Sequence, residues 1–375
     1  MAKKNYFDIH NEKIEDWKEF REKSKTTGLP ELLTINDLAD YLEVPAKVLG
    51  FLTQVIGSII KSKTITKRDG VSKRRLYYPN IYSADEDMAA AAQSLKEIHK
   101  LLLYKIFQNL PINNEVVYGF IDGKDVISCA SQHVGKTCVV AIDLADFFPN
   151  TTVQKVRKAL KEYAPFSQAV VWALTKLTTF RGHTPQGFAT SPMITNFVFK
   201  PIDDKIHAWA KEHGWVYTRY ADDLIFSKDG DPLDMLREAD ELVEVVKGFA
   251  AELDYKVKER KTKIMIHPQP QYVLGAKVNK KLNISRSAYR YLRAAVHNFV
   301  VKHRVPKDVP LTEVGIESYF RSLKGQVAWA YRLNPTRLQP IKDLLDSVNL
   351  DKVINARYGH IIRRNEKKEK LEQVL

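Results

Sequence analysis

The segment from residue 215 to residue 227 constrains the fold of this chain most strongly, because it places two adjacent acids between two β-forming runs. Aromatic and β-branched residues flank Asp222 and Asp223 on both sides, which is typical of two strands joined by a tight turn. We therefore expect a hairpin with both carboxylates at its tip. A single Asp is common in turns because its side chain caps the local backbone, but two in succession call for a further explanation.

A third acid, Asp143, closes the apolar run of residues 137–143. Such a run is typical of a strand buried on both faces, where an unpaired carboxylate is costly. If this strand end lies beside the hairpin tip, three carboxylates converge, and divalent cations relieve their repulsion most simply. Mg²⁺ fits an oxygen-only ligand set. Two ions about 3.5–4 Å apart would activate an attacking 3′-hydroxyl and stabilise a leaving pyrophosphate, which is polymerase chemistry.

The charge of the chain points to a polyanionic partner. Lys and Arg number 59 against 45 Asp and Glu, a formal net charge of +14. Residues 286–375 alone hold 18 Lys and Arg and 9 Asp and Glu. Nucleic acid is the partner that this excess favours, although a basic surface can also serve solubility alone.

Composition excludes several other classes of protein. No apolar run reaches the roughly 18 residues that a membrane helix needs, so we expect no membrane span. The two cysteines, Cys129 and Cys138, cannot supply a disulfide framework. Residues 1–7 are basic without an apolar stretch behind them and do not resemble a secretory signal. A reducing cytoplasm is the setting that these features favour.

Hydrophobic periodicity and turn residues predict a chain of mixed α and β structure. A basic hairpin is expected over residues 64–78, turning at Asp69 and Gly70. Ser191 followed by Pro192 predicts an N-cap and the first residue of a helix. Helices are expected as short pieces over residues 11–60, and over residues 86–109, 151–178 and 192–213.

Three motifs, in this order, resemble those of bacterial reverse transcriptases. They are Asp-Leu-Ala-Asp-Phe-Phe at residues 143–148, Thr-Pro-Gln-Gly-Phe-Ala-Thr-Ser-Pro at residues 184–192, and Tyr-Ala-Asp-Asp at residues 220–223. The resemblance implies an α+β right-hand polymerase fold with fingers, a palm built on an antiparallel sheet, and a helical thumb. The implied domains are an N-terminal helical extension (1–60), fingers with part of the palm (61–136), the palm with inserted finger helices (137–280) and a basic helical thumb (281–375).

The same resemblance implies the metal ligands and the sugar selectivity of the active site. The implied ligands of two Mg²⁺ ions, with Mn²⁺ as an alternative metal, are Asp143, Asp222, Asp223 and the backbone carbonyl of Leu144. Phe148 becomes a steric gate whose ring would collide with a ribose 2′-hydroxyl, which favours deoxynucleotides. Phe147 and Phe148 also suit a hydrophobic core, and we expect one of them to serve there.

The incoming nucleotide has implied contacts in the hairpin and in the second motif. Arg74, with Lys67 seven residues earlier, resembles the fingers pair that grips the triphosphate. The neighbouring Arg75 leaves that assignment open by one position. Gln186 and Gly187 belong to the second motif, in which the glycine lets the backbone approach the nucleotide.

Further residues after the second motif receive roles from the resemblance. Lys261, within the charge run 258–263, resembles the family lysine that protonates the departing pyrophosphate. A solvated charge run is the alternative for it. Tyr220 is implied to contact nucleic acid, and residues 271–279 resemble the hairpin that holds the primer end. An ordinary edge hairpin is the alternative there.

Two further boxes narrow the resemblance to retron reverse transcriptases. The Asn-Ala-x-x-His box before the first catalytic Asp is Cys-Ala-Ser-Gln-His at residues 129–133, so the histidine fits and the Asn is replaced. The Val-Thr-Gly box is Val-Leu-Gly at residues 273–275. His133 and Gly275 are thereby implied to contact nucleic acid, with a core histidine and a plain β-turn as the alternatives.

A basic helix is expected after Ser285, which suits the N-cap position. Four cations in it fall at spacings of four, three and four, which places them on one helical face. No acid lies between residues 286 and 300, so the cations repel one another and favour phosphate as a partner. We expect a thumb that grips the primer–template or the cognate RNA. The cations are Arg286, Arg290, Arg293 and His297.

The resemblance implies a nucleotidyltransferase that synthesises DNA on an RNA template from deoxynucleoside triphosphates. In retrons, part of a dedicated structured non-coding RNA is copied from a guanosine 2′-hydroxyl into a branched RNA–DNA, called msDNA. The family further implies anti-phage defence with an effector protein, and a host ribonuclease H that removes the copied RNA. Two alternatives stay open. One is another bacterial reverse transcriptase, group II intron-like or diversity-generating, and the other is a scaffold that holds RNA without copying it.

Overall fold

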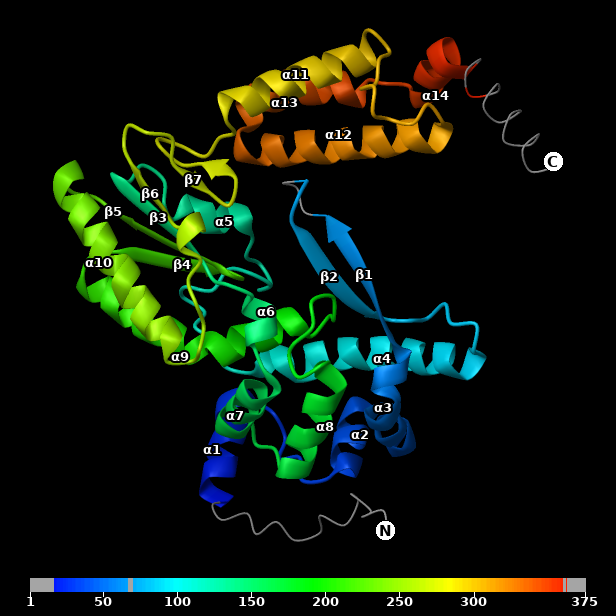
Figure 1. Cartoon of the computed structure of the whole chain (residues 1–375), viewed down its shortest axis with the longest axis vertical. Helices are drawn as coiled ribbons and strands as arrows, with labels where there is room; N and C mark the ends of the chain where they lie inside the picture. The colour runs from blue at the N-terminus through cyan, green and yellow to red at the C-terminus, as the bar shows by residue number, and fades with distance from the viewer. Residues whose placement is uncertain (1–16, 67–69, 360–361, 363–375) are drawn as a thin grey trace. The chain divides into compact units, whose positions relative to one another are not determined.

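The computed structural model describes residues 17–66, 70–359 and 362 (Figure 1). The chain divides into two compact units. Unit 1 comprises Met1–Asp125, Val140–Lys228 and Leu236–Ile264, and unit 2 comprises Val126–Val139, Asp229–Met235 and Met265–Leu375. The chain therefore passes between the units several times, and their division cuts across the four domains that the resemblance implies.

A four-stranded sheet carries the acidic motifs. Its strand order is β4-β5-β3-β6, so the β4–β5 hairpin lies next to the strand that ends at Asp143. β4 and β5 pair antiparallel with Tyr220 opposite Asp223, which leaves a turn of Ala221 and Asp222. The expected strand and the expected hairpin are both confirmed. The bounds are β3 Cys138–Asp143, β4 Val216–Tyr220, β5 Asp223–Lys228 and β6 Lys263–Ile266.

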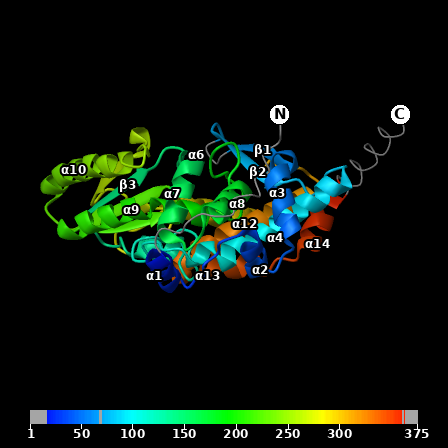
Figure 2. The same cartoon turned by 90° about the horizontal axis from the view of Figure 1, so that it is seen from below.

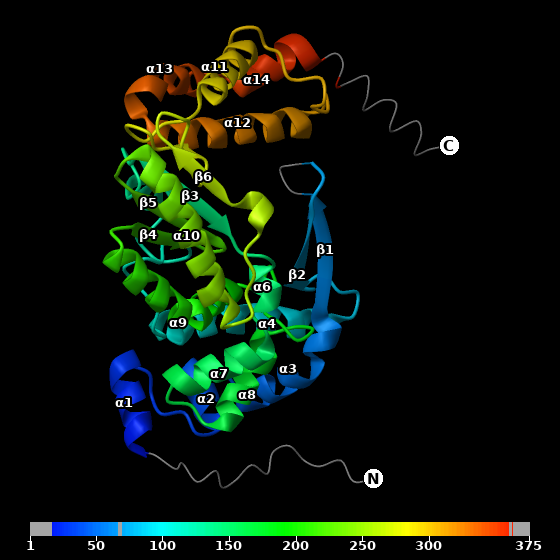
Figure 3. The ribbon, with the colours of Figure 1, turned by 60° about the vertical axis from the view of Figure 1, so that its left-hand side comes forward.

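Two long helices lie along this sheet (Figure 3). They are α9, Ser191–Glu212, which packs on β4, and α10, Pro232–Ala251. α9 begins one residue earlier than expected, with Thr190 as its N-cap. The Ser191 hydroxyl donates to the carbonyl of Pro185 at 2.6 Å instead of capping the helix. This bond ties the start of α9 to the second motif.

Helices α2, α3, α4 and α8 pack together in unit 1 (Figure 2). Leu49 and Leu174 belong to the apolar cluster between them. The helical stretch expected over residues 151–178 forms two helices, because Ala164 is extended before Pro165. The bounds are α1 Trp17–Thr27, α2 Ile35–Leu42, α3 Ala46–Ile59, α4 Glu86–Lys105, η1 Phe107–Asn109, α6 Phe147–Asn150, α7 Val153–Tyr163 and α8 Gln168–Thr178.

The basic hairpin is confirmed in unit 1. Its strands are β1, Ile60–Thr66, and β2, Lys73–Pro79, which pair antiparallel. The register sets Ile65 opposite Arg74 and Thr64 opposite Arg75. Because side chains alternate along a strand, the two arginines lie on opposite faces of the hairpin.

Unit 2 contains the basic helix and a small hairpin. α11 begins after the predicted N-cap Ser285, whose hydroxyl accepts from the Ala288 N–H at 3.0 Å. α11, α12 and α13 pack against one another (Figure 1). In the β7–β8 hairpin, Leu274 and Gly275 have φ values of 49° and 88°, as a type I′ turn requires. The bounds are α5 Val126–Ser131, β7 Tyr272–Val273, β8 Ala276–Lys277, α11 Arg286–Val300, α12 Glu313–Leu333, α13 Pro335–Asp346, α14 Leu350–Val353 and η3 Ile354–Tyr358.

Helix length and apolar content decide whether the described residues could span a membrane. None of them is by itself long and apolar enough to cross a membrane. The bent pair α2 and α3 reaches that length and composition together, with 108° between the two helices. Buried leucines of both helices, Leu38 and Leu49 among them, belong to the core of unit 1.

Candidate active site

The acidic motifs meet where the end of β3 lies beside the β4–β5 turn. The backbone N–H of Leu144 donates to the carbonyl of Asp222 at 2.9 Å. Ala221 takes a left-handed conformation, with φ 55°, which reverses the chain between Tyr220 and Asp223. The residues that the structure brings together here are Asp143, Leu144, Asp222 and Asp223.

Burial and charge repulsion at this turn perturb the pKa of Asp223. Burial, followed by the charges of Asp222 and Asp143, raises the pKa of Asp223 to about 7. Lys261 and Lys258 oppose that shift. A carboxylate whose ionised form is disfavoured in this way is stabilised by a positive ion beside it.

The donor set suits a hard divalent cation, because it consists of carboxylate oxygens. Asp143 Oδ1 is buried and accepts no well-aligned hydrogen bond from the described residues, although Lys258 Nζ lies 2.7 Å from it. Among the described side chains, no group of three or more His, Cys, Asp or Glu is already gathered as a metal site. The oxygen ligands and the negative charge of the three Asp residues therefore suit a divalent metal ion. Their side chains would have to rotate to coordinate it.

Two lysines pair with Asp143. Lys261 Nζ lies 2.8 Å from Asp143 Oδ2, and this hydrogen bond raises the pKa of Lys261. Lys258, which sequence reasoning left in a charge run, is the second. Residues 259–261 form the 3₁₀ turn η2, Glu259–Lys261, in which side chains three positions apart are eclipsed. Lys258 and Lys261 therefore point the same way, and their spacing was the available signal.

The two phenylalanines after Asp143 have different environments. Phe147 is buried, and its ring centroid lies 5.5 Å from those of Phe199 and Tyr255. Phe148 is half-buried on the short helix α6. Phe147 is thus the core residue of the pair, which leaves Phe148 as the candidate gate.

The second motif packs against the basic hairpin. The Tyr77 N–H donates to the carbonyl of Gln186 at 2.8 Å. Gly187 has φ 113°, and a Cβ added there would lie 2.4 Å from the carbonyl oxygen of Tyr77. The structure gives this glycine a close approach to β2, and its approach to the nucleotide stays a prediction. The position of the hairpin is therefore coupled to the second motif.

The faces of the hairpin differ in how far protein covers them. Tyr77, on the Arg75 face, packs edge-on against another ring with centroids 5.4 Å apart. Tyr78, on the Arg74 face, is 39% exposed. The Arg74 face is therefore the more open one at this level of the hairpin. Lys67, the other predicted triphosphate contact, lies outside the described residues.

The remaining predicted nucleic-acid contacts are spread over both units. Tyr220 is half-buried, with its ring centroid 6.1 Å from that of Phe120. In unit 2, His133 is fully buried, and burial, reinforced by the charge of Lys136, lowers its pKa to about 3. This agrees with the core alternative for His133 and not with a direct contact to nucleic acid. Gly275 is exposed at its turn. The α11 cations are all exposed: Arg286, Arg290, Arg293 and His297.

Sequence reasoning missed a buried ion pair behind the catalytic turn. Arg219 of β4 is 0% exposed. Its guanidinium donates to Asp203 of α9, from Nε to Oδ1 at 2.8 Å and from Nη2 to Oδ2 at 2.6 Å. Although burial disfavours the charge, Asp203 holds the pKa of Arg219 above its usual value. The Tyr217 hydroxyl also donates to Asp203, at 2.8 Å. An arginine within a β-forming run of Val, Tyr and Thr was the available signal.

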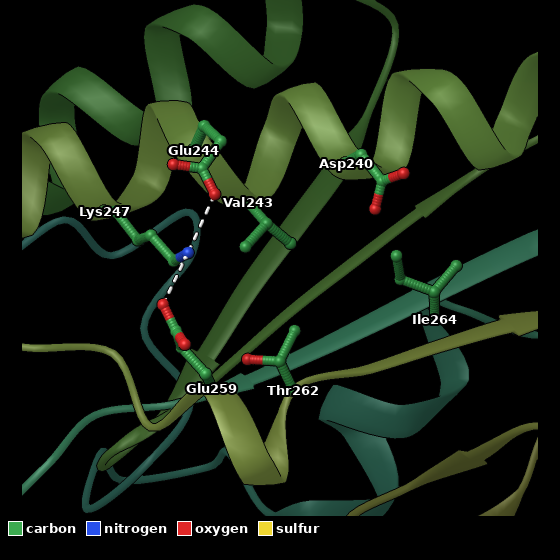
Figure 4. A pocket seen from close by; sticks show the side chains of 7 residues that line it. All are labelled: Asp240, Val243, Glu244, Lys247, Glu259, Thr262 and Ile264. Atoms are coloured by element: carbon green, nitrogen blue, oxygen red, sulfur yellow. Dashed lines mark hydrogen bonds and ion pairs between the residues drawn. The ribbon is translucent and has the colours of Figure 1, made fainter.

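A separate open pocket of about 470 Å³ lies between α10 and the chain from η2 to β6 (Figure 4). Lys247 bridges Glu244 and Glu259 across it, at 2.7 and 2.9 Å. Asp240 adds another acid to its lining. None of the predicted site residues lines this pocket, and its acidic wall does not suit an anionic nucleotide.

Comparison with known proteins leads to one family. Residues 88–284 match the family described as reverse transcriptase (RNA-dependent DNA polymerase). The chain is 31% identical over 356 residues to the retron Mx162 reverse transcriptase of Myxococcus xanthus, covering 84% of this chain and 67% of that protein. The retron Mx65 reverse transcriptase of the same organism is 30% identical over 267 residues, 67% of this chain and 58% of that protein. The retron Ec86 reverse transcriptase of Escherichia coli is 24% identical over 275 residues, 73% and 80% of the two chains.

Proposed function

Since the chain belongs to the retron reverse transcriptases and has the right-hand polymerase fold of the wider family, we propose that it is an RNA-directed DNA polymerase. The observation that carries this proposal is the 2.9 Å hydrogen bond between Leu144 N–H and the carbonyl of Asp222. It joins the strand end that bears Asp143 to the turn that bears Asp222 and Asp223. An intact set of three carboxylates argues against a scaffold that only holds RNA.

The proposed ligands of two Mg²⁺ ions are Asp143, Asp222, Asp223 and the carbonyl of Leu144. Bound Mg²⁺ would lower the pKa of the attacking 3′-hydroxyl and offset the charge that develops on the pyrophosphate. The chain itself keeps the carboxylates close together and surrounds Asp143 with the positive charges of Lys258 and Lys261. Lys261 would then donate a proton to the departing pyrophosphate.

The nucleotide would lie against the basic hairpin and the second motif, which contact each other through a backbone hydrogen bond. We assign the triphosphate to Arg74, because its face of the hairpin is the more open one, and to Lys67. The half-buried ring of Phe148 would exclude a ribose 2′-hydroxyl. The backbone of Gln186 and Gly187, which is tied to β2, would line the nucleotide site.

We further propose that the template is a cognate structured RNA and that the product is branched msDNA, which acts in anti-phage defence with an effector protein. Host ribonuclease H would remove the copied RNA. Support comes from the similarity to three retron reverse transcriptases and from the exposed cationic face of α11. The proposed phosphate contacts on that face are Arg286, Arg290, Arg293 and His297, and Tyr220 and Gly275 are proposed to contact the primer–template.

Sequencing the nucleic acid that co-purifies with the protein tests the retron proposal. An RNA joined through a 2′-linkage to a short complementary DNA supports it. RNA alone would favour the scaffold, and unbranched complementary DNA would favour a different bacterial reverse transcriptase. The three outcomes exclude one another, so the experiment decides among the alternatives.

The catalytic assignment is tested with the double variant Asp222→Asn and Asp223→Asn. DNA synthesis on an RNA template with Mg²⁺ should disappear, because the amides lose the charge that holds the metal. Asp240→Asn, an exposed acid of α10, is the matched control for loss of charge and should keep parental activity. Synthesis by the double variant would show that the metal ligands lie elsewhere.

A further inference from the structure

We propose that Arg219 and Asn196 are positioning residues for the catalytic turn. Loss of the hydrogen bonds of either residue weakens metal binding by Asp222 and Asp223. The inference rests on the proposed function, because it concerns how the proposed metal ligands are aimed. Neither residue reaches the reacting atoms. Each acts on the turn through the backbone of Ala221.

Arg219 holds the turn from inside the protein. Its Nη1 donates to the carbonyl oxygen of Ala221 at 3.0 Å. The other edge of the guanidinium, Nε and Nη2, donates to both carboxylate oxygens of Asp203. A bidentate pair of this kind fixes the plane of the guanidinium. The donor that faces Ala221 is therefore held in one direction.

Asn196 of α9 completes the arrangement. Its Oδ1 accepts from Arg219 Nη1 at 3.0 Å, and its Nδ2 donates to the carbonyl of Gly119 at 2.9 Å. Gly119 lies against the turn itself, since a Cβ added there would be 2.7 Å from the backbone nitrogen of Ala221. Residues 116–118 also bond to both backbone groups of Arg219. α9 thus holds the turn by two routes, through Arg219 and through the segment that ends at Gly119.

The turn needs this hold because Ala221 is a non-glycine residue with φ 55°, a conformation that L-residues adopt unfavourably. Relaxation of Ala221 would rotate the peptide that joins it to Asp222 and would move both carboxylates of the turn. Asn196, Asp203 and Arg219 are each 0% exposed, so water is not at hand to replace a lost hydrogen bond.

The variant Asn196→Ala tests the positioning of the turn without changing the charge of any residue near the metal site. It removes one of the two acceptors of Arg219 Nη1 and the donor to the carbonyl of Gly119, and it leaves the ion pair with Asp203 in place. Residues that orient metal ligands from outside typically contribute about 10- to 100-fold to metal affinity. Because Asn196 acts through Arg219 and the backbone, we expect the lower end, about a tenfold rise in the dissociation constant. Arg219→Lys, which keeps the charge but not the fork, should act in the same direction.

Thr195→Ala is the matched control. Thr195 is the neighbouring residue of α9, is also 0% exposed, and loses one hydrogen bond, from its hydroxyl to the carbonyl of Pro192 at 2.7 Å. It has no bond to the turn or to Arg219 among those of the described residues. Both alanine variants should lose stability in thermal unfolding, Asn196→Ala more because it loses hydrogen bonds to both Arg219 and Gly119 instead of a single bond, while only Asn196→Ala changes the metal site.

The first measurement is the dissociation constant of Mn²⁺ for the whole chain, obtained from the electron paramagnetic resonance signal of free Mn²⁺. The second is the Mn²⁺ concentration that gives half-maximal incorporation of one nucleotide. The dissociation constant of Mn²⁺ and the half-maximal Mn²⁺ concentration should both rise in Asn196→Ala. Both should stay at the parental value in Thr195→Ala. Unchanged Mn²⁺ affinity in Asn196→Ala and Arg219→Lys, or equal weakening in Thr195→Ala, overturns the inference. A parental protein that binds Mn²⁺ but makes no DNA refutes the proposed function instead, and the affinity comparison still decides the positioning role.

Discussion

Replacing Gly187 by alanine is expected to impair nucleotide incorporation far more than it impairs folding. The added Cβ would lie 2.4 Å from the Tyr77 carbonyl oxygen, whereas real Cβ contacts essentially never fall under 3.0 Å. The second motif and β2 must therefore separate by at least 0.6 Å. Displacements of about 1 Å in a catalytic arrangement can cost about 100-fold in rate, so we expect a loss of roughly 10- to 100-fold.

Gly182→Ala is the matched control for the conformational part of the effect. Gly182 also has positive φ, 83°, but a Cβ there meets nothing within 4 Å. Both substitutions place a side chain on a left-handed or related backbone conformation, which costs about 1–3 kcal/mol of stability. Only Gly187→Ala adds the overlap with β2, so the difference between the two variants isolates that contact.

The assay is single-turnover incorporation of dTTP on a poly(rA) template with an oligo(dT) primer, with thermal unfolding of each variant in parallel. Gly182→Ala should lose stability and keep its incorporation rate. Gly187→Ala should lose more stability than Gly182→Ala, because of the overlap with β2, and should also lose most of its rate. Rates of the two variants within about threefold of each other would refute the coupling between the hairpin and the second motif.

Three further predictions test residues around the site. Arg74→Ala should raise the KM for dNTP by about tenfold or more, through loss of a charge-assisted contact, and Arg75→Ala should raise it less; equal effects in steady-state kinetics would contradict the assignment of faces. Phe148→Ala should raise the efficiency of ribonucleotide relative to deoxynucleotide incorporation by roughly 10- to 100-fold, and an unchanged ratio would remove Phe148 as the gate. Asp203→Asn should lower the free energy of unfolding by about 3–5 kcal/mol in urea, because Arg219 keeps a buried unpaired charge, whereas Asp204→Asn, in a half-exposed pair with Lys200, should cost about 0–1 kcal/mol; similar losses would argue against the buried pair.

The sequence predicts the parts of the site that local pattern encodes. The β4–β5 hairpin and the strand ending at Asp143 follow from short β-forming runs around acids, and both are present in the structure. Ser285 as the N-cap of α11 follows from side-chain chemistry that acts over three residues. Each of these features depends on neighbours in the sequence, so it can be recognised without knowledge of tertiary contacts.

Other parts of the site depend on contacts between distant segments. Arg219 is buried only because Asp203 and Asn196 of α9 lie behind β4, and no local pattern states that pairing. The close approach of Tyr77 to Gly187 joins segments more than a hundred residues apart in the chain. The division of the helical stretch 151–178 follows from Pro165, which disfavours a helical conformation at Ala164.

The buried guanidinium of Arg219 has a consequence for how this protein loses activity. Its hydrogen bonds to Asp203, Asn196 and the carbonyl of Ala221 form only when α9 and the turn are both in place. An unpaired buried charge costs several kcal/mol. When α9 detaches, we therefore expect β4 to unfold and become exposed to water. A folded state with a slightly misaligned turn is less favourable. Partial denaturation should accordingly yield two populations, one with full activity and one with none. We therefore expect local unfolding of α9 and loss of activity to occur together.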